Sequence, residues 1–276
     1  MCHMARVKTW LVVVAGVMAV ALSAPATRAS SFAVTPTVIE LAPRAPTAVL
    51  TVENRGRTAL RFQLSAYRWE QTPGGKPVYQ PTEDLIFFPP LLTVGPGEKR
   101  LVRLGTELPF GTEEGSYRLF LSELPPLEKR GGAGEALVTV LTNVGVPVFL
   151  EPAQVTASGR LEDLRLQGGE LAFSVKNEGN VRLVVLEPLV KGLDGKGGVT
   201  FGEKLKAGYV LAHGRLDFHT KIPAGDCLKS QRLAVTATVE EPATDENVTD
   251  KRLNSEVAVA PGACAGRLKA NSLKSL

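Results

Sequence analysis

The chain has 276 residues, of which 44% are hydrophobic and 22% are charged. This length and this balance fit two globular domains of ordinary size and exclude a disordered chain. The formal net charge is +4, but three of the 32 basic residues, Arg6, Lys8 and Arg28, lie near the N-terminus, which leaves 29 basic residues against 28 acidic ones. A nearly neutral chain without a basic stripe argues against a nucleic-acid partner.

Residues 1–29 have the pattern of a signal peptide. Arg6 and Lys8 form a basic start, an apolar run over 10–22 follows, and small residues precede two candidate cleavage points. We expect cleavage after Ala29, with Ala26 as the alternative. The apolar run is too short for a stable membrane anchor, and no later segment is apolar enough to cross a bilayer. The sequence therefore predicts an exported protein whose mature form is not inserted in a membrane.

Residues 30–152 read as short strands separated by turn signals, a pattern typical of an immunoglobulin-like β-sandwich. The expected strands are 34–41, 47–53, 59–70, 78–79, 85–88, 99–104, 116–124 and 136–150. The clearest alternation of apolar and polar residues lies over 59–70, where Leu60, Phe62 and Leu64 share one face. No amphipathic helix of normal length is expected.

The stretch Ala136–Leu150 is uncharged, rich in Val and long for a strand. It is largely apolar on both faces, so both faces need a cover. Two interpretations remain open: its valines pack inside their own domain, or a second protein covers one of the faces.

Residues 153–266 predict a second β-sandwich, and 267–276 a flexible tail. Its expected strands are 161–166, 170–176, 181–191, 209–212, 215–218, 233–240 and 257–259, with 242–250 as a polar loop. Cys2 leaves with the signal peptide, so Cys227 and Cys264 remain. In an oxidising compartment we expect them to form a disulfide, the alternative being two buried free thiols.

Residue patterns that carry chemistry are missing from the sequence. His213 and His219 flank a predicted turn without a thiolate or clear carboxylate partner, and no Ser stands in a nucleophile elbow. Residues 192–198 are rich in Gly but lack the spacing of a phosphate-binding loop. Glu113 and Glu114 are adjacent and would point apart on a strand. We therefore expect no catalytic residues, no bound metal, no cofactor and no enzymatic activity.

The first predicted domain resembles the periplasmic chaperones of chaperone–usher pilus assembly. The ordered motifs that carry the resemblance are Val34-x-Pro36-x-Val38-Ile39-x-Leu41, Glu53-Asn54-Arg55-Gly56, Phe88-Pro89-Pro90, Pro96-Gly97-Glu98-Lys99-Arg100-x-Val102-Arg103-Leu104 and Tyr117-Arg118-Leu119-Phe120-Leu121-Ser122-Glu123-Leu124-Pro125-Pro126. The second domain matches more loosely, through Asn177-x-Gly179-Asn180 and Gly208-Tyr209-Val210-Leu211. The resemblance implies an all-β protein of two immunoglobulin-like sandwiches arranged as an L.

The resemblance also implies a partner for the stretch Ala136–Leu150. Chaperones of this family cap pilin subunits, which lack one strand, by lending them the last strand of the first domain, and deliver them to an outer-membrane usher. The matching donor positions are Val138, Val140, Thr142 and Val144. A periplasmic pilus chaperone is thus the leading hypothesis. The alternative is an exported structural or adhesive protein of two sandwiches.

Two departures from the family concern the basic residues that bind the carboxylate of the pilin. By alignment these residues fall at Val38 and near Pro147, and neither is basic here. Glu151 stands where a basic residue commonly precedes the interdomain Pro. The anchor is then either absent or supplied from elsewhere, with Arg100 and Arg103 as basic residues nearby in the sequence. These departures and the short loop over 127–135 resemble the divergent, archaic-type branch.

Overall fold

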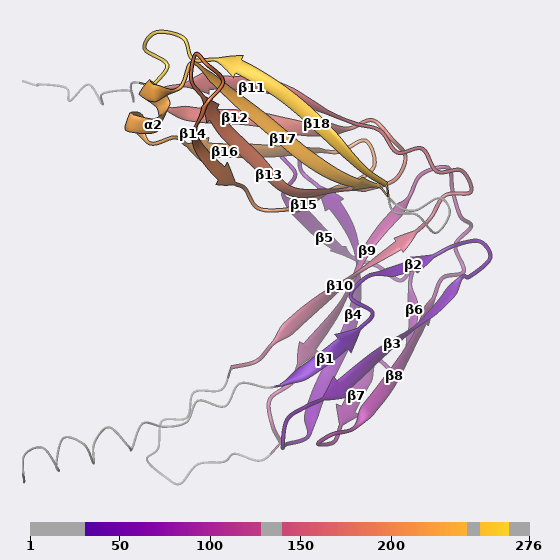
Figure 1. The fold of residues 1–276 in the computed structure, drawn as a ribbon. Helices are drawn as coiled ribbons and strands as arrows, with labels where there is room; N and C mark the ends of the chain where they lie inside the picture. Colours follow the sequence, from indigo (N-terminus) through magenta and orange to yellow (C-terminus); the bar gives the residue numbers. More distant parts are fainter. Residues whose placement is uncertain (1–30, 128–139, 242–248, 265–276) are drawn as a thin grey trace, which may run out of the picture.

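The computed structural model describes residues 31–127, 140–241 and 249–264. Nearly all its ordered elements are β-strands, which form two sandwiches that meet at an angle (Figure 1). The predicted fold, two immunoglobulin-like sandwiches in an L, is confirmed. The predicted signal peptide 1–29, all of the predicted loop 127–135 except its first residue, and the tail 267–276 lie outside the described residues.

The N-terminal sandwich consists of two sheets with the strand orders β1-β3-β8-β6 and β2-β10-β9-β4-β5, and β7 pairs with β4. The strands are β1 (Phe32–Thr35), β2 (Ile39–Leu41), β3 (Thr47–Asn54), β4 (Leu60–Gln71), β5 (Pro77–Pro81), β6 (Ile86–Phe88), β7 (Leu91–Val94), β8 (Lys99–Gly105), β9 (Gly115–Glu123) and β10 (Asn143–Leu150). The apolar face of β4 lies in the core between the sheets, where Phe62 is fully buried. The alternation seen in the sequence thus decides which face of β4 is covered.

The C-terminal sandwich has one sheet of order β11-β12-β16 and one of order β14-β13-β17-β18, with β15 paired to β13. Its elements are β11 (Gly159–Gln167), β12 (Glu170–Asn177), β13 (Leu183–Leu193), β14 (Val199–Lys204), β15 (Gly208–Val210), β16 (Arg215–Lys221), α2 (Ala224–Lys229), β17 (Arg232–Glu241) and β18 (Thr249–Ala258). Its core is separate from that of the first sandwich and includes Phe173, Val190 and Leu233.

Two strands, β7 and β14, lie outside the set predicted from the sequence, and of β18 only the end was predicted, as the strand 257–259. The end of the predicted loop 242–250 is in fact the start of β18, whose sequence is almost entirely polar. Among residues 250–258 of that strand, only Leu253 is buried. β18 is an edge strand that pairs with β17 along ten residues, so backbone hydrogen bonds hold it where apolar burial does not.

The same buried asparagine turn occurs in both sandwiches. Asn54 and Asn177 are fully buried. Each amide nitrogen donates to the carbonyl four residues ahead, that of Thr58 or Val181. Each amide oxygen accepts the N–H of the Gly two residues ahead. The short Asn-containing turns visible in the sequence are therefore structurally equivalent, and in each the side chain satisfies backbone groups that the turn leaves unpaired.

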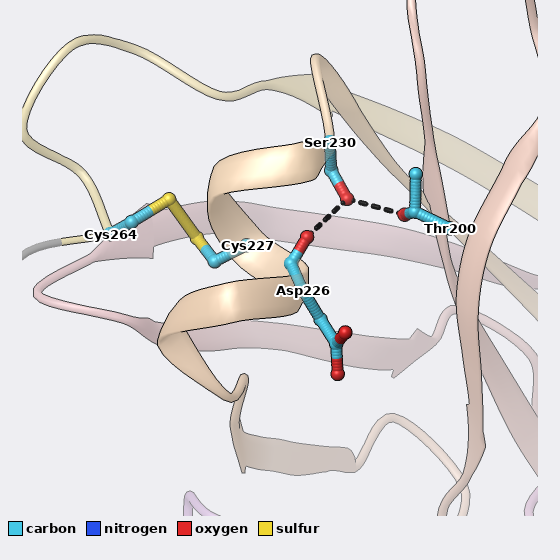
Figure 2. Close-up of a disulfide and its surroundings, with 5 residues drawn as sticks. All are labelled: Thr200, Asp226, Cys227, Ser230 and Cys264. Carbon is cyan, nitrogen blue, oxygen red and sulfur yellow. Dashed lines mark hydrogen bonds between the residues drawn. A yellow bond between two sulfur atoms is a disulfide. The ribbon is translucent and has the colours of Figure 1, made fainter.

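A disulfide joins Cys227, in the short helix α2, to Cys264 near the end of the described chain (Figure 2). The hydroxyl of Ser230 donates to the carbonyl of Asp226 and lies 2.6 Å from the hydroxyl of Thr200, which holds the end of the helix against β14. The bridge closes a loop of 37 residues. In the chain-entropy model, a disulfide that closes a loop of this length stabilises the fold by about 4 kcal/mol, because it lowers the entropy of the unfolded chain.

Candidate functional site

β10 is shorter than the predicted strand Ala136–Leu150. It begins at Asn143, and Val140 to Thr142 precede it without strand pairing, while 136–139 lie outside the described residues. The pairing partner of Asn143 is Ser122, one residue before β9 ends. Beyond that end come Pro125 and Pro126, which have no N–H to extend the ladder. The prediction was therefore wrong for 140–142, because the neighbouring strand stops first.

The predicted donor positions, Val138, Val140, Thr142 and Val144, lie in different surroundings from the residues that follow them in β10. Val146, Val148 and Leu150 are buried in the core of their own sandwich, and Val144 is half-buried against that core. Thr142 is half-buried, and Val140 is 61% exposed. Val138 lies outside the described residues. The valines at the end of β10 thus pack inside their own domain. The exposed apolar side chain of Val140 lies just before the start of β10.

One edge of β10 is open over half of its length. β9 pairs with all of β10, whereas β2 pairs in parallel only with Val148 to Leu150. Within the described ranges no strand pairs with the other side of Asn143 to Pro147. In Figure 1 this strand runs along the side of the lower sandwich that faces the angle between the two units. An open edge of this kind can accept a further strand.

The open edge presents the backbone groups of the odd-numbered residues of β10. The N–H of Glu123 donates to the carbonyl of Thr142 on the β9 side, and the N–H of Glu151 donates to Leu41 on the β2 side. Hydrogen bonding alternates along an antiparallel ladder, so the backbone N–H and C=O groups of the odd-numbered residues Asn143, Gly145 and Pro147 point away from β9. The missing N–H of Pro147 therefore costs the sheet no internal hydrogen bond, which explains a Pro inside this strand.

A guanidinium, that of Arg118, lies beside the open edge. Arg118 is the cross-strand partner of Pro147, and its Nη1 donates to the carbonyl of Gly145 at 3.0 Å. The guanidinium stacks 4.2 Å from the ring centre of Trp69 and 5.9 Å from that of Tyr209 of the second sandwich. Its Nε is buried and has no hydrogen-bond partner among the described residues. Arg118 thus places a positive charge where the two sandwiches meet β10.

Arg118 was not singled out from the sequence, although it stands in the quoted motif after Tyr117. The signal is its place on the polar side of an alternating strand. Val38 packs with the apolar cluster between the sandwiches, and Pro147 is buried. Arg100 and Arg103 lie on β8, in the other sheet, and Arg100 is paired with Glu98. The cation beside the edge therefore comes from β9.

A second charged group, also not predicted, joins the two sandwiches. Arg182, directly before β13, is almost fully buried and stacks 3.8 Å from the ring centre of Phe149. Its Nη1 lies 2.5 Å from the carboxylate of Glu114, whose side chain is fully buried, and its Nη2 donates to Glu40. Glu113 and Glu114 precede β9 rather than lying on a strand as predicted, and they have different surroundings: Glu113 is exposed and pairs with His213 of the second sandwich.

In the described part of the chain, no catalytic or metal-binding cluster of side chains is found. His213 and His219 pair with different carboxylates, those of Glu113 and Glu170, each at 3.4 Å. The described residues include no group of three or more His, Cys, Asp or Glu side chains arranged to hold a metal ion. None of the helices in the described ranges has the length and apolar character needed to span a bilayer. What the geometry offers is a strand edge for a partner.

Comparison with known families identifies the N-terminal sandwich. Residues 31–156 match the family described as pili and flagellar-assembly chaperones, PapD N-terminal domain. The N-terminal sandwich is therefore a domain of the pilus-assembly chaperone family. The matched range contains both β10 and Arg118. A search of curated protein sequences found no match to the chain.

Solved structures resemble the chain over both sandwiches. A chain of the CsuC–CsuE chaperone–tip adhesion subunit complex from archaic Csu pili of Acinetobacter baumannii is 17% identical with a TM-score of 0.57, over 81% of this chain and 98% of that one. A chain of the Salmonella enterica SafA pilin–SafB chaperone complex is 15% identical with a TM-score of 0.52, over 84% and 99%. The Pseudomonas aeruginosa CupB2 chaperone is 15% identical with a TM-score of 0.51, over 80% and 100%. At these identities the likeness shows a shared fold.

Proposed function

We propose that this protein is a periplasmic chaperone that caps pilus subunits with the open edge of β10 and delivers them to an outer-membrane usher. The observation that carries the proposal is that edge, over Asn143 to Pro147, with the exposed Val140 next to it. Backbone groups of the edge bind the incoming strand, and apolar side chains upstream enter the pockets of the subunit.

The donor set of the proposal is Val138, Val140 and Thr142. Val144 belongs with them in sequence but also packs against the core of its own sandwich, so it marks the inner end of the donated segment. Residues 140–142 have no strand pairing in the free protein, although Thr142 is hydrogen-bonded to Glu123, so the backbone of Val140 is available to pair with the subunit. The likeness to a chain of the archaic CsuC–CsuE complex supports the archaic-type branch.

The remaining parts of the proposal follow from the family. The protein acts without enzymatic activity, in the periplasm, after removal of residues 1–29. Residues 30–152 form the chaperone domain and 153–266 the second domain, followed by the tail 267–276. The cap is held by contacts alone and needs neither metal nor cofactor.

The experiment that tests the proposal is co-expression of the full chain with the small secreted β-rich proteins encoded beside its gene. We expect a stoichiometric complex with at least one of them, in which the subunit is soluble only when the chaperone is present. A protein that instead polymerises outside the cell and binds none of these subunits would favour the structural or adhesive alternative.

We further propose that Arg118 binds a carboxylate of the captured subunit. The contacts described for its guanidinium are rings and one carbonyl oxygen rather than a carboxylate, and its Nε lacks a partner. A hydrogen bond between charged groups contributes about 1.5–3 kcal/mol, so Arg118→Met is expected to weaken subunit binding by about 10- to 100-fold. Titration of the purified subunit measures it. Arg103→Met, an Arg on the other sheet, is the matched control and should bind normally; equal binding by both variants would rule out this role.

A further inference from the structure

Three carboxylates surround one guanidinium where the two sandwiches meet. Glu40 on β2, Glu114 before β9 and Glu151 after β10 all come from the N-terminal sandwich, and Arg182 comes from the other. Glu40 and Glu114 touch Arg182 directly, and Glu151 interacts electrostatically with Glu40 and Arg182. If all three carboxylates are ionised, the group carries two negative charges more than positive ones.

Burial makes this surplus costly at one position in particular. The side chain of Glu114 is 0% exposed, whereas that of Glu40 is 47% exposed and keeps contact with water. A buried charge is tolerated only when it is fully compensated, and Arg182 is shared among the three carboxylates. A proton on Glu114 removes one of the two surplus negative charges, at the position that water cannot reach, and leaves Arg182 paired with Glu40.

We propose that the two sandwiches dock with the uptake of one proton at Glu114, so that the joint is held more firmly in mildly acidic than in alkaline solution. The proton replaces a charge that would otherwise be buried between the domains. This inference concerns the joint itself and is independent of the partner bound at β10.

The pKa shifts of two of the carboxyls have the direction that this geometry predicts. Burial raises the pKa of Glu114 to about 7, against the opposing attraction of Arg182. Burial and the nearby Glu40 also raise the pKa of Glu151. Because three carboxyls and one guanidinium interact, the proton belongs to the group as a whole, with Glu114 as its most buried member.

Other charged groups face the same joint and have to be separated from Glu114 in any test. Glu113 lies 3.4 Å from His213 across the joint, and Lys176 donates to the carbonyl of His213. A proton on His213 would also strengthen the contact between the sandwiches. The variants Glu114→Gln and Glu113→Gln distinguish the two sources, because each removes one carboxylate and leaves the other.

The direction of the pH effect follows from linkage. A carboxyl whose pKa is 4.5 in the unfolded chain and about 7 in the docked protein binds more protons when docked, between these two values. Its stabilising effect is complete below pH 4.5 and is lost as the pH rises through 7. For one such group, the equilibrium constant for opening rises by about 10- to 100-fold between pH 5 and pH 8.

Trp69 provides the probe for the experiment. It is buried in the apolar cluster between the sandwiches, 5.3 Å from the ring of Tyr209 of the second domain. The only other tryptophan, Trp10, lies in the proposed signal peptide, so Trp69 is the single reporter of the mature chain, and Trp10→Phe makes it so in a chain that keeps residues 1–29. Urea titrations followed by Trp69 fluorescence, repeated from pH 5 to pH 8.5, measure the opening of the joint.

We expect the Trp69 transition to move to lower urea as the pH rises. In Glu114→Gln most of this dependence should disappear, with stability at pH 8 at least equal to that of the parent, while Glu113→Gln should keep it. If Glu114→Gln does not fold, Glu151→Gln should show a smaller pH dependence, because the surplus is reduced by one charge. A parent protein without pH dependence, a dependence retained in Glu114→Gln, an undiminished dependence in Glu151→Gln, or its loss in Glu113→Gln would each overturn the proposal.

Discussion

Val140→Asp is expected to lower the affinity for a captured pilus subunit by more than about 100-fold and to leave the fold of the chaperone unchanged. Burying a Val side chain contributes about 1.5–3 kcal/mol, and placing a carboxylate in an apolar pocket adds several kcal/mol of cost. In the free protein Val140 is 61% exposed, so the substitution removes little packing there. Titration of the purified subunit and thermal unfolding of the free chaperone measure the two effects.

The matched control is Val199→Asp, in β14 of the second sandwich, because Val199 is also 61% exposed. The two variants should have the same thermal stability and differ only in subunit binding. If Val140→Asp still binds the subunit as tightly as Val199→Asp does, the donor segment is assigned wrongly, whatever the role of the β10 edge.

Arg182→Met is expected to cause the largest loss of stability among single substitutions at the joint. It leaves the fully buried carboxyl of Glu114 without its cation. Removing one member of a buried ion pair costs about 3–5 kcal/mol. Because Glu114 can take up a proton instead, the loss should be largest at pH 8 and smaller at pH 6. Urea unfolding followed by Trp69 fluorescence measures it.

Arg160→Met provides the comparison, since Arg160 is exposed and pairs with Glu162 and Glu178 within its own sandwich. An exposed pair contributes about 0–1 kcal/mol, so this variant should be nearly as stable as the parent. Combining Arg182→Met with Glu114→Gln should restore part of the lost stability. Equal stability of Arg182→Met and Arg160→Met at pH 8 would show that the buried pair does not hold the joint.

The sequence was sufficient for the fold because the signals that define it are local. Alternation over 59–70 gives the buried face of β4, and turn residues separate most strands. The polar strand β18 carries no such signal, because its place is decided by pairing with β17. The start of β10 is likewise decided by the end of β9 rather than by its own residues.

The proposed site was predicted in part. The strand that carries it is the last one of the first domain, as the resemblance implies, but the charged residues around it were not found. Arg118 and Arg182 look like ordinary outward-facing residues in sequence, because their neighbours Gly145, Glu40 and Glu114 come from other strands and from the other sandwich. Contacts that form only when distant segments meet leave no periodic signal.

Pro147 determines how far along β10 an added strand can pair with the open edge. A strand added beside Asn143 and Gly145 finds donors and acceptors, but at Pro147 it finds a carbonyl without an N–H, and beyond that β2 already occupies the edge. The open edge is therefore a short pairing site that ends at Pro147. At high concentration, β-rich proteins tend to aggregate by pairing their exposed edge strands. A pairing site of this length accepts one short strand and does not allow the sheet to extend further.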